Sequence, residues 1–440
     1  MKFNKWTMGL AAIGVVSLAS AARADETATK FDKVNTALSN TTLSGYVDVG
    51  AEFNPGGVGY GEDYYYSAQP NGYPGSRGYT GGPGYYAFAK ANGFYLNSVD
   101  LALDKPQDES PWASGYHVEL MFGPDATPAS YTGNDGTTAI RQAYITLRTP
   151  IGNSAIDWKA GVFDTIIGYE STTDGANPNY TRSYGYTMEP TTHTGILATF
   201  KATDWISLSA GIADTYYNGY YGGFLPGVNS GTSANAMNWP TVMGSVALTA
   251  PDSWGWAKGA TFNAGVINNG GNSYYSNQGG GGATSLYAGA TVPTPLTALK
   301  VGASFDYLEM HNQAAYGYNP GNDNIWDVAL YGSYQFNDKL SLNLRGEYLN
   351  QSGAGYNSAT VLVPYVQNGY YYNNYYYNYI APNVEAVTAT LQYALWANVL
   401  SRVEFRWDHA EHGTPFAYGS SGQYGTANAF TLALNLIYQF

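Results

Sequence analysis

Apolar and polar residues alternate along most of the chain beyond residue 42. The last stretch, Ala429 to Phe440, shows this pattern most clearly. Because successive side chains of a strand point to opposite faces, a period of two predicts a β-strand with one oily face. The oily row consists of Phe430, Leu432, Leu434, Leu436, Tyr438 and Phe440. Ile437 is the exception, a large apolar residue on the opposite face.

Sixteen segments carry this alternation and are predicted to be strands. They cover residues 43–53, 94–104, 115–122, 139–148, 156–163, 194–200, 206–213, 241–249, 260–267, 285–292, 299–308, 325–336, 340–349, 385–395, 400–409 and 429–440. In the segment 400–409, Arg402, Glu404, Arg406 and Asp408 share one face, and Val403, Phe405 and Trp407 share the other. Four charges on one face are costly in lipid and favourable in water.

The connections between these segments alternate in length. Short turns such as residues 150–153 and 337–339 alternate with long Gly-, Tyr- and Asn-rich segments such as 214–238 and 350–382. An even number of antiparallel strands with short turns at one end predicts a transmembrane β-barrel with short periplasmic turns and long extracellular loops. About sixteen strands leave an aqueous channel. A soluble β-sandwich with its charged face in solvent is the alternative.

The composition supports a membrane barrel. The chain has 440 residues, of which only 12% are charged, with 43 Tyr, 54 Gly and no Cys. Soluble domains carry about a quarter of charged residues. Beyond the N-terminus no apolar run reaches the roughly 18 residues of a membrane-spanning helix. The net charge of -13 argues against a nucleic-acid partner, and the lack of Cys excludes disulfides and zinc-thiolate sites.

The N-terminus has the pattern of an export signal. A basic start, an apolar core over residues 8–19 and an Ala-Arg-Ala sequence before Asp25 predict a signal peptide at residues 1–24. A membrane anchor is the alternative, but the apolar core is too short to span a bilayer. We expect a short periplasmic stub at residues 25–42 and the barrel at residues 43–440, located in the outer membrane of a Gram-negative-type bacterium.

Several short motifs resemble the OmpL-like family of outer-membrane β-barrel porins. They lie at residues 43–48 (LSGYVD), 161–170 (GVFDTIIGYE), 179–184 (NYTRSY), 193–195 (HTG), 390–393 (TLQY) and 402–408 (RVEFRWD). The resemblance implies a passive porin, and it supplies no catalytic residues. The terminal Phe440 is also similar to the last residue of bacterial outer-membrane barrels, which the barrel assembly machinery reads.

General porins fold the loop after the fifth strand into the pore, and the resemblance assigns this role to residues 164–192. The alternative is a loop that lies over the barrel mouth. Arg345, Arg402 and Arg406 are expected to face the carboxylates of this segment across the lumen, or else to pair with neighbouring strands. The predicted pore-lining or constriction residues are Asp48, Glu119, Asp157, Asp164, Glu170, Arg182, Arg345, Glu347, Arg402, Glu404, Arg406 and Asp408. The excess of carboxylates predicts a mild cation preference.

Aromatic residues near the ends of the predicted strands are expected to contact lipid at the two membrane interfaces. The candidates are Trp158, Trp205, Trp326, Trp396, Trp407, Tyr438 and Phe440. Tyrosine clusters at residues 64–66 and 370–379 lie in predicted outer loops. Stacked phenol rings can bind sugar faces, and the same composition also suits a loop that packs on itself.

An enzymatic site is not indicated. His409 and Asp408 are adjacent, and neighbours on a strand point to opposite faces. The sequence contains no phosphate-binding, dinucleotide-binding or metal-binding motif, so no metal or cofactor is predicted. We expect a porin that passes small polar solutes or ions passively, with outer-membrane lipid and a homotrimer as partners. A structural or adhesive surface protein and an outer-membrane hydrolase remain alternatives.

Overall fold

A computed structural model describes residues 41–53, 92–123, 138–214, 240–269, 282–312, 321–352, 359–367, 370–378, 383–411, 416–418 and 424–440. The predicted signal peptide, nearly all of the predicted stub and the tyrosine cluster at residues 64–66 lie outside this part of the chain. The side chains of the second tyrosine cluster also lie outside it.

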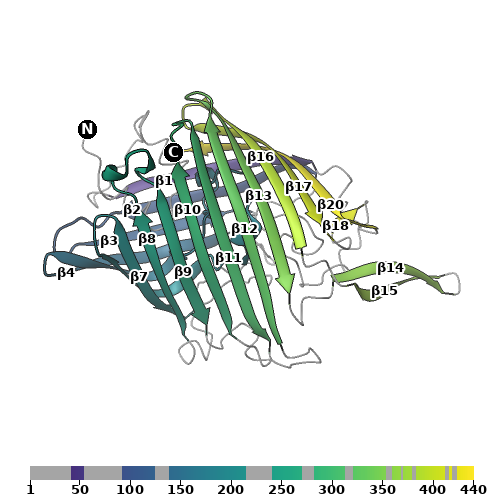
Figure 1. Cartoon of the computed structure of the whole chain (residues 1–440), viewed down its shortest axis with the longest axis horizontal. Helices are drawn as coiled ribbons and strands as arrows, with labels where there is room; N and C mark the ends of the chain where they lie inside the picture. The colour runs from purple at the N-terminus through teal and green to yellow at the C-terminus, as the bar shows by residue number, and fades with distance from the viewer. Residues whose placement is uncertain are drawn as a thin grey trace.

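Sixteen antiparallel strands close into one barrel (Figure 1). Each strand pairs with the barrel strands that precede and follow it, and β1 pairs with β20 to close the ring. The strands are β1 Thr42–Phe53, β2 Gly93–Lys105, β3 Ser114–Phe122, β4 Thr138–Ile151, β5 Ser154–Asp164, β6 Thr192–Lys201, β7 Ile206–Ala213, β8 Thr241–Thr249, β9 Thr261–Asn269, β10 Ala283–Pro293, β11 Leu299–Asn312, β12 Gly321–Gln335, β13 Leu340–Ser352, β16 Asn383–Trp396, β17 Val399–Ala410 and β20 Asn428–Gln439. The predicted all-β antiparallel barrel is confirmed.

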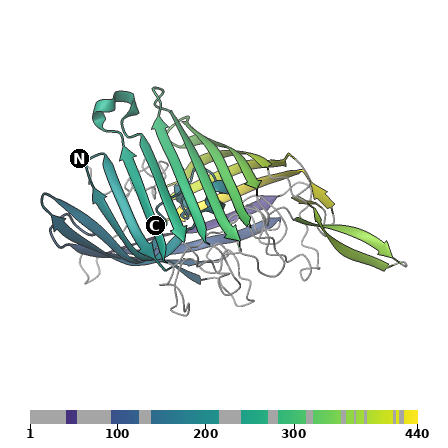
Figure 2. The ribbon, with the colours of Figure 1, turned by 60° about the horizontal axis from the view of Figure 1, so that its bottom comes forward.

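Four further strands lie outside the barrel sheet. β14 Ala359–Gln367 pairs with β15 Tyr370–Asn378, and β18 Phe416–Tyr418 pairs with β19 Tyr424–Thr426. The β14–β15 hairpin stands clear of the barrel in both views (Figures 1 and 2). The first hairpin lies within residues 350–382, which the sequence analysis predicted to be a long connection between barrel strands. A hairpin needs paired backbone groups and does not need one apolar face, so side-chain alternation does not reveal it.

The described helices are short. They are η2 Asp174–Ala176, α3 Tyr184–Met188 and η4 Asp252–Ala257. Within the described ranges, no helix has the length and apolar character that crossing a membrane would require. α3 begins after Ser183, whose hydroxyl oxygen accepts a hydrogen bond from the Tyr186 N–H at 3.0 Å.

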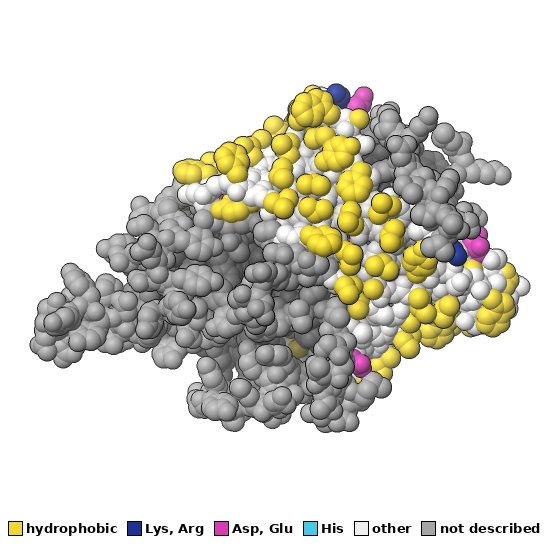
Figure 3. All heavy atoms as spheres, turned by 180° about the vertical axis from the view of Figure 1, so that it is seen from behind, with side chains coloured by type: hydrophobic (Ala, Val, Ile, Leu, Met, Phe, Trp, Pro, Cys, Tyr) yellow, Lys and Arg dark blue, Asp and Glu magenta, His cyan; other side chains and the backbone are white. Residues whose placement is uncertain are grey.

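The outer face of the barrel is apolar. Leu330, Val403 and Leu434 are 61%, 52% and 54% exposed. Figure 3 shows hydrophobic side chains spread over one side of the wall, with charged side chains near its margins. The outward apolar row of β12 begins at Trp326 and ends at Phe336, the residue that follows the strand. About ten residues at ~3.3 Å each, tilted by about 40°, span roughly 25 Å, the height of the apolar band of outer-membrane barrels.

Aromatic side chains lie at both ends of this apolar band. At the short-turn end, Trp205 and Tyr438 are 41% and 49% exposed, and Phe440 is half-buried. Trp158 is half-buried and donates to the Thr149 hydroxyl at 3.1 Å.

Toward the long-loop end, Trp326 lies 5.5 Å from the Tyr348 ring, and Trp407 donates to Asn428 at 3.0 Å. Trp396 ends β16 and is 71% exposed. The sequence analysis omitted three exposed tryptophans from its interface candidates, namely Trp112, Trp254 and Trp256. They lie in the short connections, outside the alternating pattern.

Ile437, the exception to the terminal alternation, faces inward. It is fully buried and packs against Tyr46, Met121 and Leu400. The inner face is therefore not uniformly polar, because apolar residues are used where the interior is filled by protein.

Candidate functional site

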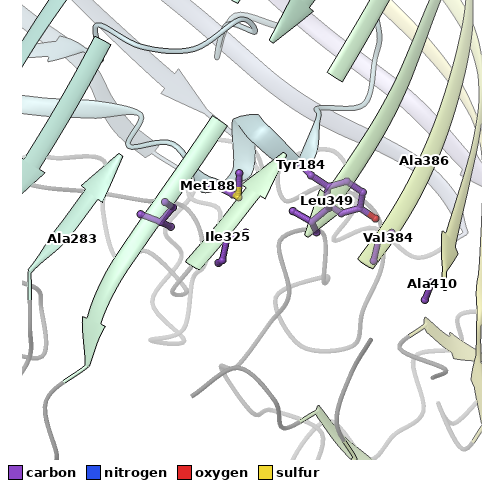
Figure 4. Packing of buried hydrophobic residues seen from close by; sticks show 9 residues of the cluster. Tyr184, Met188, Ala283, Ile325, Leu349, Val384, Ala386 and Ala410 are labelled. Atoms are coloured by element: carbon purple, nitrogen blue, oxygen red, sulfur yellow. The ribbon is translucent and has the colours of Figure 1, made fainter. Parts of the chain in front are cut away.

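The connection between β5 and β6, residues 165–191, lies inside the barrel, and we call it the inner segment. It contacts inward-facing residues on β1, β2, β10, β12, β13, β16, β17 and β20. Strands on so many sides of the ring are within reach only from the lumen. Figure 4 shows its helix α3 among the strand residues Ile325, Leu349 and Val384.

Apolar contacts fix the start of the inner segment. Ile166 and Ile167 are each 6% exposed, and they pack against inward-facing residues of β5 to β10. This group comprises Phe163, Leu197, Ala213, Met243, Ile267 and Tyr287. The sequence analysis missed the cluster because it expected a wet and polar inner face throughout. The signal was present, since Leu197, Met243 and Ile267 stand on otherwise polar faces of their strands.

Tyr169 ties the inner segment to β10, β11 and β12. Its ring stacks on Tyr331 at a centroid distance of 4.0 Å, and its hydroxyl hydrogen-bonds to the Thr291 hydroxyl at 2.9 Å. Gly302 lies beneath it, where an added Cβ would be 1.9 Å from the Tyr169 oxygen. Only glycine allows this close approach.

Arg345 on β13 connects the inner segment to the barrel wall through several hydrogen bonds. It is 1% exposed, and its guanidinium donates to Glu170 at 2.8 Å and to Glu347 at 2.5 Å. It also donates to the carbonyl oxygens of Thr181 at 2.5 Å and Arg182 at 3.0 Å. A guanidinium has five N–H donors and no acceptor, so its burial requires such a set of acceptors.

The two predicted arginines of β17 act in the same way. Arg402 donates to the carbonyl oxygens of Asp174 at 3.1 Å and Asn177 at 2.6 Å. Arg406 donates to the carbonyl oxygen of Arg182 at 2.7 Å. The inner segment lacks regular structure over most of its length, and these side chains satisfy backbone carbonyls that a helix or sheet would otherwise pair.

Wall carboxylates satisfy the N–H groups of the inner segment. Glu404 accepts from the backbone N–H groups of Tyr180 at 2.6 Å and Thr181 at 2.9 Å. Glu347 accepts from the Tyr184 N–H at 2.7 Å. Hydrogen bonds to a charged partner are the stronger kind, so these contacts fix the path of the segment.

The structure shows where the three arginines lie. The sequence analysis left two arrangements open for Arg345, Arg402 and Arg406: facing the carboxylates of the inner segment across the lumen, or pairing with neighbouring strands. All three touch the segment directly, because it reaches the wall formed by β13 to β20, and Arg345 and Arg406 also pair with carboxylates of that wall. Asp408 completes this contact by accepting from the Tyr184 hydroxyl at 2.7 Å and from Arg406 at 3.0 Å.

A second buried network joins β3, β4 and β5. Arg141 is 5% exposed and donates to Glu119 at 2.5 Å and to Asp164 at 2.8 Å. Gln142 also donates to Glu119, at 2.8 Å. The sequence analysis missed Arg141. A β-bulge between Glu119 and Leu120 shifts the register, so the adjacent Arg141 and Gln142 are both buried against Glu119.

The remaining candidates lie apart from these networks. Asp48 on β1 accepts from Asn97 at 2.8 Å and from Asn435 at 2.5 Å. Asp157 lies near the short-turn end, where it pairs with Arg148 at 3.0 Å. Asp157 is the most exposed of the predicted lining carboxylates for which an ion pair is described, with a side-chain exposure of 36%.

Among the described residues, no basic side chain forms an ion pair with Glu189, which lies near the end of the inner segment. Glu189 is 4% exposed and stands near Asp306. Burial, and next the negative charge of Asp306, raises the pKa of Glu189 well above its usual range. Gly168 gives it space, because an added Cβ there would be 2.4 Å from a Glu189 oxygen.

The histidine considered for hydrolysis is placed elsewhere. His409 Nδ1 lies 2.9 Å from the Asn428 side-chain oxygen, whereas Asp408 faces inward onto Arg406. In the described part of the chain, no three or more His, Asp or Glu residues are arranged to hold a metal ion.

Comparison with known proteins agrees with this geometry. Residues 40–440 match the sequence model of the family described as "Putative beta-barrel porin-2, OmpL-like". The sequence matches no curated protein. Among solved structures, the outer membrane channel DcaP of Acinetobacter baumannii is 13% identical, with a TM-score of 0.55 over 91% of this chain and 97% of that chain.

Two further structures share the fold. OprB of Pseudomonas putida is 11% identical, with a TM-score of 0.53 over 91% of this chain and 94% of that chain. OmpT of Vibrio cholerae, solved in a trimer form, is 13% identical, with a TM-score of 0.50 over 91% and 99%. The family match over nearly the whole chain and the sixteen-stranded barrel establish that this protein belongs to the OmpL-like family of beta-barrel porins, which form channels in the outer membrane.

Proposed function

We propose that this porin passes small hydrophilic solutes by passive diffusion, and that the inner segment forms the constriction they must pass. The main support is the inner segment itself, which charged wall residues hold inside a barrel that is apolar outside. A hydrated lumen replaces part of a solute's water shell, while width and lining charge select among solutes. Diffusion of this kind breaks no covalent bond.

A mild preference for cations belongs to the same proposal. On β1, β11 and β12, the inward-facing carboxylates Asp48, Glu52, Asp306 and Asp327 stand against one inward-facing basic residue, Lys300. Charges set in a low-dielectric wall act over the lumen and raise the local concentration of counter-ions. An excess of carboxylates therefore favours cations.

Channel recordings test this proposal. Purified protein added to a planar bilayer should give discrete conductance steps, and the reversal potential in a KCl gradient should have the sign of a cation-preferring pore. Liposomes that contain the protein should swell in small sugars, more slowly as the sugar grows. Background swelling without conductance would refute the channel proposal and favour the structural or adhesive alternative. A clear anion preference would refute the selectivity.

The proposal extends to export, assembly and orientation. Residues 1–24 direct export, the short turns face the periplasm, and the barrel assembly machinery recognises Phe440. A homotrimer is supported by the trimer form of the similar OmpT fold. Unheated gel electrophoresis after cross-linking should show a species of three chains, and a single-chain species alone would contradict the trimer.

A further inference from the structure

The charged side chains inside the barrel differ in exposure. Arg345, Arg402 and Arg406 are at most 2% exposed, because the inner segment covers them. Lys159 on β5 and Lys300 on β11 are half-buried and face the lumen on the part of the wall that the segment leaves accessible. The two lysines therefore keep more exposed surface than the arginines, which the inner segment covers.

Lys300 stands beside the short connection between β10 and β11. Its neighbour Val301 is 40% exposed on the outer face, so the Lys300 side chain points inward. Its register partners are the uncharged Pro293 and Ser333. Among the described residues, no carboxylate forms an ion pair with Lys300. Its ammonium group is available to an anion.

Lys159 lies deeper, toward the inner segment. Its ammonium nitrogen is 4.8 Å from the centroid of the Tyr144 ring. The negative charges nearest in effect to Lys159 are those of Asp164 and Asp104. Asp164 pairs with Arg141, and Asp104 pairs with His117. No ion pair to Lys159 is present in the described ranges. The cation is held over a ring face and is not neutralised by a carboxylate.

The wall between the two lysines is polar and uncharged. The inward-facing, half-buried residues from β6 to β11 include Thr199, Ser209, Ser245, Asn263, Thr291 and Gly302. The Thr199 and Ser209 hydroxyls lie 3.0 Å apart and hydrogen-bond to each other. Such a wall offers hydrogen bonds to a solute and leaves the charge of the lysines uncompensated.

We propose that the inner face of β5 to β11 is the solute path, and that Lys159 and Lys300 are its contact points for small anionic groups such as carboxylate and phosphate. This inference rests on the proposed porin function and deepens it by naming a solute class. The two lysines limit the cation preference that the buried carboxylates produce, and the arginines are positioning residues for the inner segment.

The absence of cysteine from the sequence allows a direct test. The variants Lys159→Cys and Lys300→Cys each carry one thiol, which methanethiosulfonate reagents modify from solution. An aminoethyl reagent restores a positive charge, and a sulfonatoethyl reagent adds a negative one. Thr388→Cys is the buried control, because Thr388 is fully buried beside Arg345. Lys258→Gln is the surface control, since Lys258 pairs with Asp252 on η4, which extends beyond the strand ends (Figure 2).

Reversal potentials are measured in a KCl gradient near 0.1 M salt for each charge state. Each unit of positive charge removed should raise the cation-to-anion permeability ratio about twofold, as expected for a charge ~8 Å from an ion in screened water. The aminoethyl adduct should restore the wild-type ratio. Adding phosphate to the bath should lower the KCl conductance of the wild-type channel more than that of the Lys300→Gln variant.

Each outcome is decisive. A wild-type protein without conductance would refute the porin function itself. A conducting wild type whose lysine variants leave the reversal potential unchanged would refute the solute path and leave the porin function intact. Modification of Thr388→Cys as fast as Lys300→Cys would show that the covered wall is accessible, which also contradicts the inference. Lys258→Gln should match the wild type.

Discussion

The hydrogen bonds between Arg345 and the inner segment lead to a specific prediction. Arg345→Met removes a guanidinium that donates to Glu170, to Glu347 and to two backbone carbonyls of the segment. Methionine fills similar space but leaves Glu170 buried without a cation, whereas Glu347 keeps its contact with Arg406 at 3.7 Å. Removing one partner of a buried ion pair costs about 3–5 kcal/mol. We expect the inner segment to leave the wall for a correspondingly larger fraction of the time.

The sequence of the inner segment provides a sensitive assay. Arg182 is the one trypsin site within residues 165–191, and it is 2% exposed while the segment is bound. When cleavage follows a rapid opening equilibrium, its rate tracks the population of the open form. A loss of 3–5 kcal/mol therefore predicts cleavage at Arg182 that is about 10²–10⁴ times faster. Single-channel traces of the variant should also become noisier.

The barrel itself should survive this change. β13 is held by backbone pairing to β12 and β16, which does not involve the Arg345 side chain. Heat-modifiable migration on gels should therefore be retained. The control Lys201→Ala removes an exposed pair with Asp204, worth about 0–1 kcal/mol, and should leave tryptic cleavage at Arg182 unchanged. Unaltered cleavage in Arg345→Met would refute the role given to Arg345.

Three further predictions concern single residues. Gly161→Ala should lower the thermal midpoint of gel migration, because Gly161 has φ +133° and an added Cβ would be 2.2 Å from the Ala143 carbonyl oxygen; an unchanged midpoint contradicts this. The raised pKa of Glu189 means that the folded state holds a proton more tightly. Protonated Glu189 therefore stabilises the folded state fully below the pKa of the unfolded state, about 4.3, and this stabilisation is lost as the pH rises through the folded-state pKa. Since glutamine does not titrate, tryptic cleavage of the inner segment should depend less on pH in Glu189→Gln than in the wild type. Phe440→Ala keeps the backbone pairing to Gly45 at 3.0 and 3.1 Å, so refolding in detergent should proceed while insertion in cells falls; equal loss of both would contradict a recognition role.

The boundaries of the barrel strands follow from side-chain alternation where one face meets lipid. The segment 340–349 alternates apolar and polar residues, and its strand extends to Ser352. Beyond the apolar band the ladder of backbone hydrogen bonds continues, but both faces are polar and the alternation gives no signal. The β14–β15 hairpin was not predicted for the same reason.

The partners of the inner charges depend on the tertiary fold. The sequence identifies Arg345 and Arg406 as inward-facing, because they alternate with apolar residues that face lipid. It gives no means of knowing that the inner segment covers them, since Arg345 and Thr181 are far apart in the chain and meet only when the barrel closes. Arg141 escaped notice because a bulge, which leaves no mark on composition, changes its register.

The sequence by itself therefore determined the number of barrel strands, the inward or outward direction of most of their side chains and the apolar outer band, because each depends on the local period of two. The tertiary structure alone decided which inward charges are buried and which remain accessible. That division depends on the position of a segment without periodicity, and this position is fixed by its contacts with strands on opposite sides of the ring.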